Sequence, residues 1–289
     1  MRREELDSEE MLRLLLDFCG VNTVNGEEGC ENNGTQFLYE SLKTIPYFQE
    51  NPDCLFLQPV EGDPLKRKNL VAFLKANPPT KNTIILSGHI DTVDTEVCGP
   101  LKDLAFQPVK YTEALLKADI DDEIWKELQS GEYLAGRGVA DMKSGLAAQW
   151  AILKYYAMHL EKLKVNLLWI PVIDEENNAN GIHQAVEYFC SLRNEKYELL
   201  CCIDSEPTIT PESKDCGRIY LGTIGMVTPF ALAVGKESHV GEYFEGISAA
   251  LMAFHLGIAM ENNPEFTEIY KGKKYPPICC LRTMDFRKS

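Results

Sequence analysis

Histidine and acidic residues follow three short apolar runs of the chain, at points where strands would end. The run Thr83–Leu86 is followed by SGHIDTVD, Val165–Ile173 by DEE, and Leu199–Ile203 by DSEP. A fourth segment, GRGVADMKSG, stands just before a long helical stretch. Together these segments supply His89, Asp91, Asp141, Asp174, Glu175, Glu176, Asp204 and Glu206. Imidazole and carboxylate groups are the nitrogen and oxygen ligands that zinc and similar divalent ions accept.

The charges of these side chains favour a cation at the place where they would meet. Carboxylates within a few ångströms of one another disfavour each other's ionised form. Either some of them hold protons, or cations lie among them. Two ions about 3.5–4 Å apart would need a bridging ligand and would orient a shared hydroxide. The sequence therefore predicts a site for one or two divalent metals.

The apolar runs themselves predict the fold class. Short apolar runs that alternate with helices are typical of buried parallel strands with both faces covered. Ligands of such sheets bind outside the carboxyl ends of the strands, which is where the polar segments stand. We expect an α/β fold with a mostly parallel sheet flanked by helices. The expected helices are 8–18, 35–45, 121–128, 144–163, 181–192 and 246–260, and the expected strands are 69–74, 83–86, 165–173 and 199–203.

The sequence changes character near Asp215, after which the expected elements are a hairpin, an apolar helix and a last short strand. The hairpin strands are Arg218–Thr223 and Met226–Val234, and the last strand is Ile278–Leu281. We therefore expect residues 1–215 to form the metal-binding domain and residues 216–289 to form a smaller α+β unit.

Composition excludes several classes of function. The 289 residues include 29 Lys and Arg against 44 Asp and Glu, a net charge of −15, which a nucleic-acid phosphate backbone would repel. No apolar stretch reaches the roughly 18 residues of a membrane helix, and the charged start MRREELDSEE is unlike a secretory signal. The ten cysteines form no CxxC pair, so we interpret them as structural thiols. We expect a cytoplasmic protein without nucleic-acid or membrane partners.

Other catalytic patterns are missing or weak. The sequence contains no GxSxG, GxxxxGK[ST] or HExxH motif, which removes the common serine-hydrolase, P-loop and zincin interpretations. GRGVAD has part of a dinucleotide-binding pattern, but Asp141 would repel a pyrophosphate. A nucleotide-binding oxidoreductase is therefore a weak alternative.

Taken in order, GHIDTV, GRGVADMKSG, DEE and SEPT resemble the motifs of the dinuclear zinc aminoacylase/carboxypeptidase family. That family includes acetylornithine deacetylase, succinyl-diaminopimelate desuccinylase, glutamate carboxypeptidase and the tripeptidases. The N-terminal half is also similar to the arginine-utilisation (RocB-like) branch. The resemblance covers about residues 8–262 and implies a zinc-exopeptidase-like fold with a smaller lid domain at 216–289.

The resemblance implies a ligand set for two divalent ions, zinc or else cobalt or manganese. His89 and Glu206 would hold one ion, Glu176 would hold the other, and Asp141 would bridge both. Asp91, two residues after His89, would fix the tautomer of its imidazole.

The resemblance also implies two further catalytic residues. Glu175 would be the general base in the hydrolysis of an amide bond, taking a proton from water and passing it to the leaving amine. His239, in GKESHVGEYFEGISAA, matches the lid histidine that in the family stabilises the oxyanion in a neighbouring subunit's active site. The implied substrate is a small peptide or an N-acyl amino acid, and the implied partner is a second copy of the chain.

One departure from the family pattern leaves an alternative open. In the family the chain leaves the lid, returns to the catalytic domain and supplies a last histidine ligand, whereas this sequence ends at Ser289. We expect a truncated version of a longer enzyme. The alternative is a catalytically inactive fragment that binds metal or forms dimers.

Overall fold

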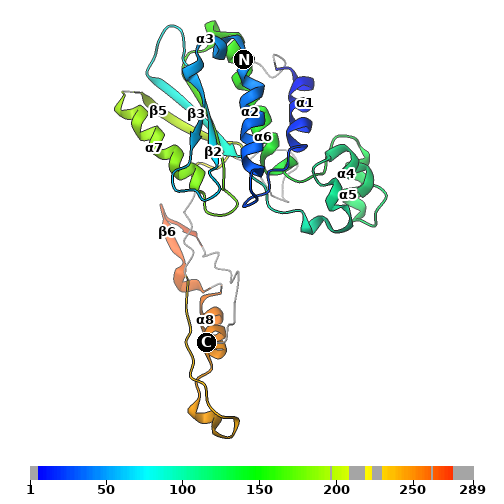
Figure 1. Ribbon diagram of the computed structural model, residues 1–289, viewed down its shortest axis with the longest axis vertical. Coiled ribbons are helices and arrows are strands. Elements are labelled where there is room, and N and C mark those ends of the chain that lie inside the picture. Colours follow the sequence, from blue (N-terminus) through cyan, green and yellow to red (C-terminus); the bar gives the residue numbers. More distant parts are fainter. Residues whose placement is uncertain (1–5, 196, 208–218, 223–229, 262, 276–289) are drawn as a thin grey trace. The chain divides into compact units, whose positions relative to one another are not determined.

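The computed structural model describes residues 6–195, 197–207, 219–222, 230–261 and 263–275 (Figure 1). The chain divides into two compact units, Met1–Gly217 and Arg218–Ser289. The first unit contains a five-stranded sheet and all the expected metal ligands.

A five-stranded mixed sheet forms the centre of the first unit, in the order β1-β2-β4-β3-β5. Its strands are β1 (Leu55–Pro59), β2 (Lys68–Leu74), β3 (Asn82–His89), β4 (Asn166–Val172) and β5 (Glu198–Asp204). Strand β3 runs parallel to both β4 and β5, whereas β2 runs antiparallel to β1 and β4. The α/β class is confirmed, and the sheet is mixed rather than mostly parallel.

The direction of β2 follows from the length of its connections. Residues 60–67 join β1 to β2, and residues 75–81 join β2 to β3. Neighbouring parallel strands need a crossover of about a dozen residues or more, so β1 and β2 can pair only as antiparallel strands. Residues 90–165 and 173–197, by contrast, are long enough to hold the helices that connect β3, β4 and β5.

Helices cover the sheet on both faces. The first unit contains α1 (Ser8–Cys19), α2 (Cys30–Lys43), α3 (Pro46–Glu50), α6 (Ser144–Met158) and α7 (Asn180–Asn194). Helix α6 packs on β2, β3 and β4, and α1 packs against α6, whereas α7 contacts β2, β4 and β5 (Figure 1). Strand β4 is buried along its whole length. Covered in this way, β4 carries the DEE segment at its end in a fixed position.

The segment between β3 and α6 contains more helix than the sequence suggested. Its α-helices are α4 (Pro108–Leu115) and the expected α5 (Asp122–Gln129), which lie together beside the sheet (Figure 1). Helix α4 begins with Pro108 at its first position, a start signal that its polar surroundings hid.

The second unit contains few regular elements in its described residues. These are α8 (Ala249–Met260), the short helices η6 (Val240–Glu245) and η7 (Pro264–Phe266), and the antiparallel strands β6 (Glu268–Tyr270) and β7 (Lys273–Tyr275). Ser248 caps α8, its side chain accepting from the Leu251 N–H at 3.1 Å. The described parts of the expected hairpin, 219–222 and 230–234, contain no strand. Residues 218, 223 and 226–229 of that hairpin and the expected strand 278–281 lie outside the described residues.

Two global expectations concern the whole chain. Within the described residues, none of the helices is both long enough and apolar enough to cross a bilayer. The cysteines that the structure describes, Cys19, Cys30, Cys54, Cys98, Cys190, Cys201 and Cys202, are all free thiols. Cys216, Cys279 and Cys280 lie outside the described residues.

Candidate metal centre

The carboxyl ends of the three parallel strands bring an imidazole and several carboxylates together. His89 is the last residue of β3, Glu176 follows β4, and Asp141 lies in the turn 139–143 just before α6. One ligand atom from each of these three residues lies within 4.8 Å of the others, and we call this set the metal cluster. His89 Nε2 lies 2.8 Å from Asp141 Oδ1 and 3.3 Å from Glu206 Oε1. All four expected ligands therefore lie at one edge of the sheet.

Burial and exposure divide the site into a fixed side and an open side. His89 is 2% exposed, whereas the side chains of Asp141 and Glu206 are 55% and 39% exposed. Glu175 is exposed and Glu176 is half-buried. The imidazole is therefore held by the protein interior, and the carboxylates face a region that a small molecule can reach.

A main-chain carbonyl orients the imidazole of His89. Its Nδ1 lies 2.8 Å from the carbonyl oxygen of Asp91, whereas the carboxylate Oδ1 of Asp91 is 3.7 Å away. The carboxylate of Asp91 instead accepts the N–H groups of Glu175 at 3.1 Å and Glu176 at 3.0 Å. Asp91 is fully buried and joins the end of β3 to the DEE segment. The role of its carboxylate in fixing the tautomer stays a prediction.

The charges at the site favour a positive ion among them. Burial lowers the pKa of His89, but the Asp141 and Glu206 carboxylates outweigh it and raise this pKa to about 11. The hydrogen bond from His89 holds the pKa of Asp141 below its usual value. Partial burial and the neighbouring carboxylates raise the pKa of both Glu175 and Glu176. A cation would relieve this repulsion, and the nitrogen and oxygen donors are of the kind that zinc binds.

His239 lies in the second unit, and its role stays a prediction. Its Nδ1 accepts the N–H of Gly241 at 3.1 Å and caps the short helix η6 (Val240–Glu245). The side chain of Glu175 is exposed, and its role as the general base likewise stays a prediction. Asp174 and Asp204, which the sequence also placed at strand ends, are outside the metal cluster.

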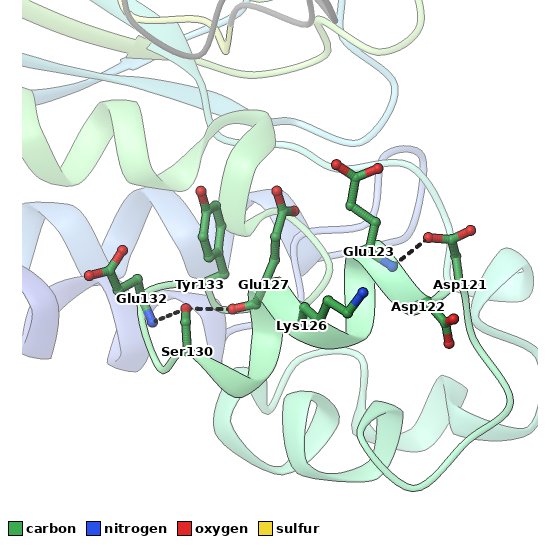
Figure 2. A pocket seen from close by; sticks show the side chains of 8 residues that line it. All are labelled: Asp121, Asp122, Glu123, Lys126, Glu127, Ser130, Glu132 and Tyr133. Carbon is green, nitrogen blue, oxygen red and sulfur yellow. Dashed lines mark hydrogen bonds between the residues drawn. The ribbon is translucent and has the colours of Figure 1, made fainter.

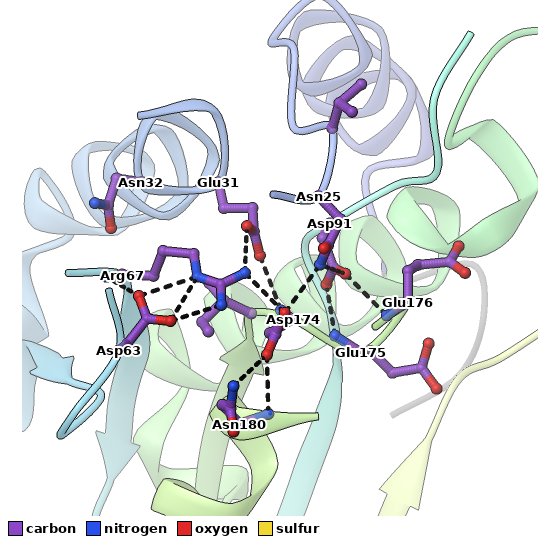
Figure 3. A network of polar contacts seen from close by, with 12 residues as sticks. Asn25, Glu31, Asn32, Asp63, Arg67, Asp91, Asp174, Glu175, Glu176 and Asn180 are labelled. Atoms are coloured by element: carbon purple, nitrogen blue, oxygen red, sulfur yellow. Dashed lines mark hydrogen bonds and ion pairs between the residues drawn. The ribbon is translucent and has the colours of Figure 1, made fainter. Parts of the chain in front are cut away.

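A buried polar network behind the DEE segment was not expected from the sequence (Figure 3). Its members include Asn25, Glu31, Asp63 and Arg67, which contact one another or Asp174. In the sequence, Arg67 lies in the basic run LKRKN, which is typical of an exposed loop. No pattern of residue types indicated that this run turns inward.

A hollow lies at α5, and none of the metal-cluster residues lines it (Figure 2). Its volume is about 720 Å³. It is lined by Asp121, Asp122, Glu123, Lys126, Glu127, Ser130, Glu132 and Tyr133. The carboxylate of Asp121 accepts the N–H of Glu123, and the hydroxyl of Ser130 accepts the N–H of Glu132. These contacts are local to α5 and the turns at its two ends.

Comparison with known proteins gives one family and several relatives. The model of peptidase family M20/M25/M40 matches residues 85–277. Protein RocB from Bacillus subtilis (strain 168) is 34% identical over 98% of this chain and 50% of its own length. Uncharacterized protein YqjN from the same organism is 33% identical over 97% of this chain and 51% of its own length. Succinyl-diaminopimelate desuccinylase from Wolbachia pipientis wMel is 29% identical over 82% and 49%. The chain thus spans about half the length of these relatives.

Solved structures similar to the chain have low sequence identity. A tripeptidase from Staphylococcus aureus matches with a TM-score of 0.51 at 16% identity, over 91% of this chain and 59% of that chain. The dipeptidase Dug1p from Saccharomyces cerevisiae matches with a TM-score of 0.50 at 14% identity, over 70% and 40%. At this level of identity the likeness concerns the fold alone.

Proposed function

The chain belongs to peptidase family M20/M25/M40, and from this premise we propose that it is a metal-dependent hydrolase of amide bonds. The observation that carries the proposal is the metal cluster, His89, Asp141 and Glu176, with ligand atoms within 4.8 Å at the carboxyl ends of parallel strands. The proposed substrates are small peptides or N-acyl amino acids, in keeping with the names of the tripeptidase and desuccinylase relatives.

We propose that these residues hold two divalent ions, which we take to be zinc, with cobalt or manganese as substitutes. His89 and Glu206 would hold one ion, Glu176 the other, and Asp141 both. Bound ions would supply Lewis acidity to the scissile carbonyl and to the attacking water. The protein contributes the fixed imidazole, whose Nδ1 contact with the Asp91 carbonyl leaves Nε2 facing Asp141.

Glu175 is the proposed general base. The Asp91 carboxylate holds its main-chain N–H, while its side chain is exposed at the open side of the site. Its pKa is raised by partial burial and by nearby carboxylates, which brings the group closer to the pH at which it must take and return a proton. Glu175 would take the proton of the attacking water and deliver it to the leaving nitrogen.

The second unit is proposed to act as a lid and dimerisation unit. His239 would donate a hydrogen bond to the oxyanion formed from the scissile carbonyl, at the site of the other copy in a homodimer. The apolar helix α8, exposed at Leu251 and Ile258, supports the dimer because it offers a surface for a second copy.

The proposal is tested with the 289-residue chain, zinc or cobalt, and a panel of N-acyl amino acids and short peptides. We expect Glu175→Gln to keep its bound metal and to lose turnover by roughly 10²–10⁴-fold, because only the proton transfer is removed. His89→Ala should lose the metal itself. Glu132→Gln, in the hollow beside α5, is the control and should change neither metal binding nor turnover. Turnover that survives Glu175→Gln would contradict the proposal, and metal binding without turnover would favour the non-catalytic alternative.

A further inference from the structure

One guanidinium and three carboxylates are buried together beside the DEE segment (Figure 3). Arg67 is 5% exposed, and its Nη1 lies 2.7 Å from Glu31 Oε2 and 2.8 Å from Asp174 Oδ1. Its Nη2 lies 2.6 Å from Asp63 Oδ1. The side chains of all three carboxylate partners are fully buried.

Stability alone is a poor explanation for this arrangement. Removing charges from water costs free energy, and an apolar replacement of similar volume is often at least as stable as a buried ion pair. Three carboxylates around one cation also repel one another. What such a network supplies is a fixed geometry, because the N–H groups of the planar guanidinium donate hydrogen bonds in few directions.

The geometry that Arg67 fixes is that of Asp174, the first residue of the DEE segment. Asp174 adopts a φ of 69°, a left-handed conformation that most side chains avoid. Its N–H donates to Glu31 Oε1 at 2.9 Å, and its carbonyl accepts from the Ala179 N–H at 2.6 Å. Its carboxylate accepts from Arg67 on Oδ1 and from the Asn180 amide on Oδ2 at 2.7 Å. Every polar group of Asp174 therefore has a partner.

Asn25 connects this network to the metal centre. Its side-chain amide donates to Asp174 Oδ1 at 3.3 Å and to Asp91 Oδ2 at 2.8 Å. The carboxylate of Asp91 in turn holds the main-chain N–H groups of Glu175 and Glu176. A continuous series of contacts thus runs from Arg67 to the main chain of the proposed base and of a proposed ligand.

We propose that Arg67 is a positioning residue, which fixes the turn bearing Glu175 and Glu176 through Asp174, with Asn25 as the link. The carboxylate partners of the guanidinium are Glu31, Asp63 and Asp174, and not Glu175 or Glu176. Its effect on metal binding therefore passes through the turn. The consequence for metal affinity rests on the proposed function, whereas the ordering of the turn does not.

The first test is hydrogen exchange of the metal-free 289-residue chain. Arg67→Met should speed exchange in residues 173–180 by about tenfold or more, because the charge-assisted hydrogen bond from Arg67 to Asp174 is lost. Leu74→Ala is the control, since Leu74 is fully buried at the far end of β2 and its loss destabilises the unit by leaving a cavity. In Leu74→Ala, the ratio of the exchange rate in residues 173–180 to that in β2 should equal the ratio in the wild type.

The second test is titration with cobalt, followed by its visible absorption. Arg67→Met should weaken cobalt binding by roughly 10–100-fold, the usual effect of losing a group that supports metal ligands. The cobalt affinity of Arg67→Lys should lie between those of Arg67→Met and the wild type. Lysine keeps the charge but lacks the planar fork that reaches three carboxylates. Leu74→Ala should bind cobalt as the wild type does.

The proposal would be overturned if, in Arg67→Met, both the exchange rate in the turn and the cobalt affinity stayed within twofold of the wild type. If the wild type and His89→Ala bind cobalt equally, the proposed metal site fails, and the exchange result alone still decides whether Arg67 orders the turn. Should Arg67→Met not fold, Asn25→Ala breaks the link and leaves the Arg67 contacts in place. It should speed exchange at Glu175 and Glu176, and unchanged exchange there would count against the proposal.

Discussion

Glu31, at the residue scale, makes the stability of the first unit depend on pH. It is fully buried, and burial raises its pKa from 4.5 to about 7, although its hydrogen bond with Arg67 acts in the opposite direction. Because the folded-state pKa is the higher one, the contribution to stability is complete below about pH 4.5. It is lost as the pH rises through about 7, since the unfolded chain then gives up its proton more readily.

The stability of Glu31→Gln relative to the wild type should therefore be greater at pH 8 than at pH 5. The wild type loses stability as Glu31 ionises, whereas glutamine cannot ionise. Urea unfolding of both metal-free proteins at the two pH values measures this difference. Glu40→Gln, an exposed change on the same helix, is the control. A difference between Glu31→Gln and wild type that is the same at both pH values would contradict the prediction.

The sequence predicted the residues of the metal centre better than their supports. The metal-centre residues are an imidazole and carboxylates that follow predicted strands or, for Asp141, precede a predicted helix, a pattern that indicates metal binding from the sequence alone. They are His89, Asp141, Glu176 and Glu206. Arg67 carried no such signal, because burial of a charged residue depends on partners that are distant in the chain. Glu31 lies 36 residues away from it in sequence, and Asp174 lies 107 residues away.

At the scale of elements, the close approach of α6 to the end of β5 positions Glu206. Gly145, the second residue of α6, has no side chain, and a Cβ there would lie 2.3 Å from the carbonyl oxygen of Ser205. That oxygen belongs to the main chain directly before Glu206. The glycine therefore allows the helix and the strand end to meet.

Gly145→Ala should lower the stability by about 1–2 kcal/mol, because the overlap with Ser205 outweighs the gain in helix propensity. It should also weaken metal binding, since Glu206 must shift with Ser205. Ser144→Ala, exposed at the same helix end, should change neither. Thermal unfolding and cobalt titration measure the two effects, and full cobalt affinity in Gly145→Ala would contradict the role given to this contact.

Elements were predictable where their residue pattern was independent of distant partners. The strands 69–74, 165–173 and 199–203 coincide closely with β2, β4 and β5, whereas 83–86 is only the middle of the longer β3. The direction of β2 was missed because a buried strand is apolar whichever way it runs. Strand β1 was missed for a related reason: it ends in Gln58 and Pro59, and its central residues are only partly buried, so its apolar pattern is short.

At the scale of the whole molecule, the two units differ in how they bury apolar surface. The buried hydrophobic residues of the described chain all belong to the first unit. Helix α8 of the second unit reads AALMAFHLGIAM, which is apolar nearly all round, yet Leu251 is 56% exposed and Ile258 is 76% exposed. A helix of this composition is normally covered on all sides. A second copy of the chain is the partner proposed for it.

Ile258→Asp should convert a dimer into a monomer, because a carboxylate in an apolar interface loses its hydration without gaining a partner. Cobalt binding by the monomer should match that of the wild type, since all the proposed ligands lie in the first unit. Val109→Asp is the matched control, an exposed valine on α4 of the first unit, and should leave the dimer intact. Light scattering on eluted protein measures the mass. A monomeric wild type, or a dimer that persists in Ile258→Asp, would show that α8 is not the contact between copies.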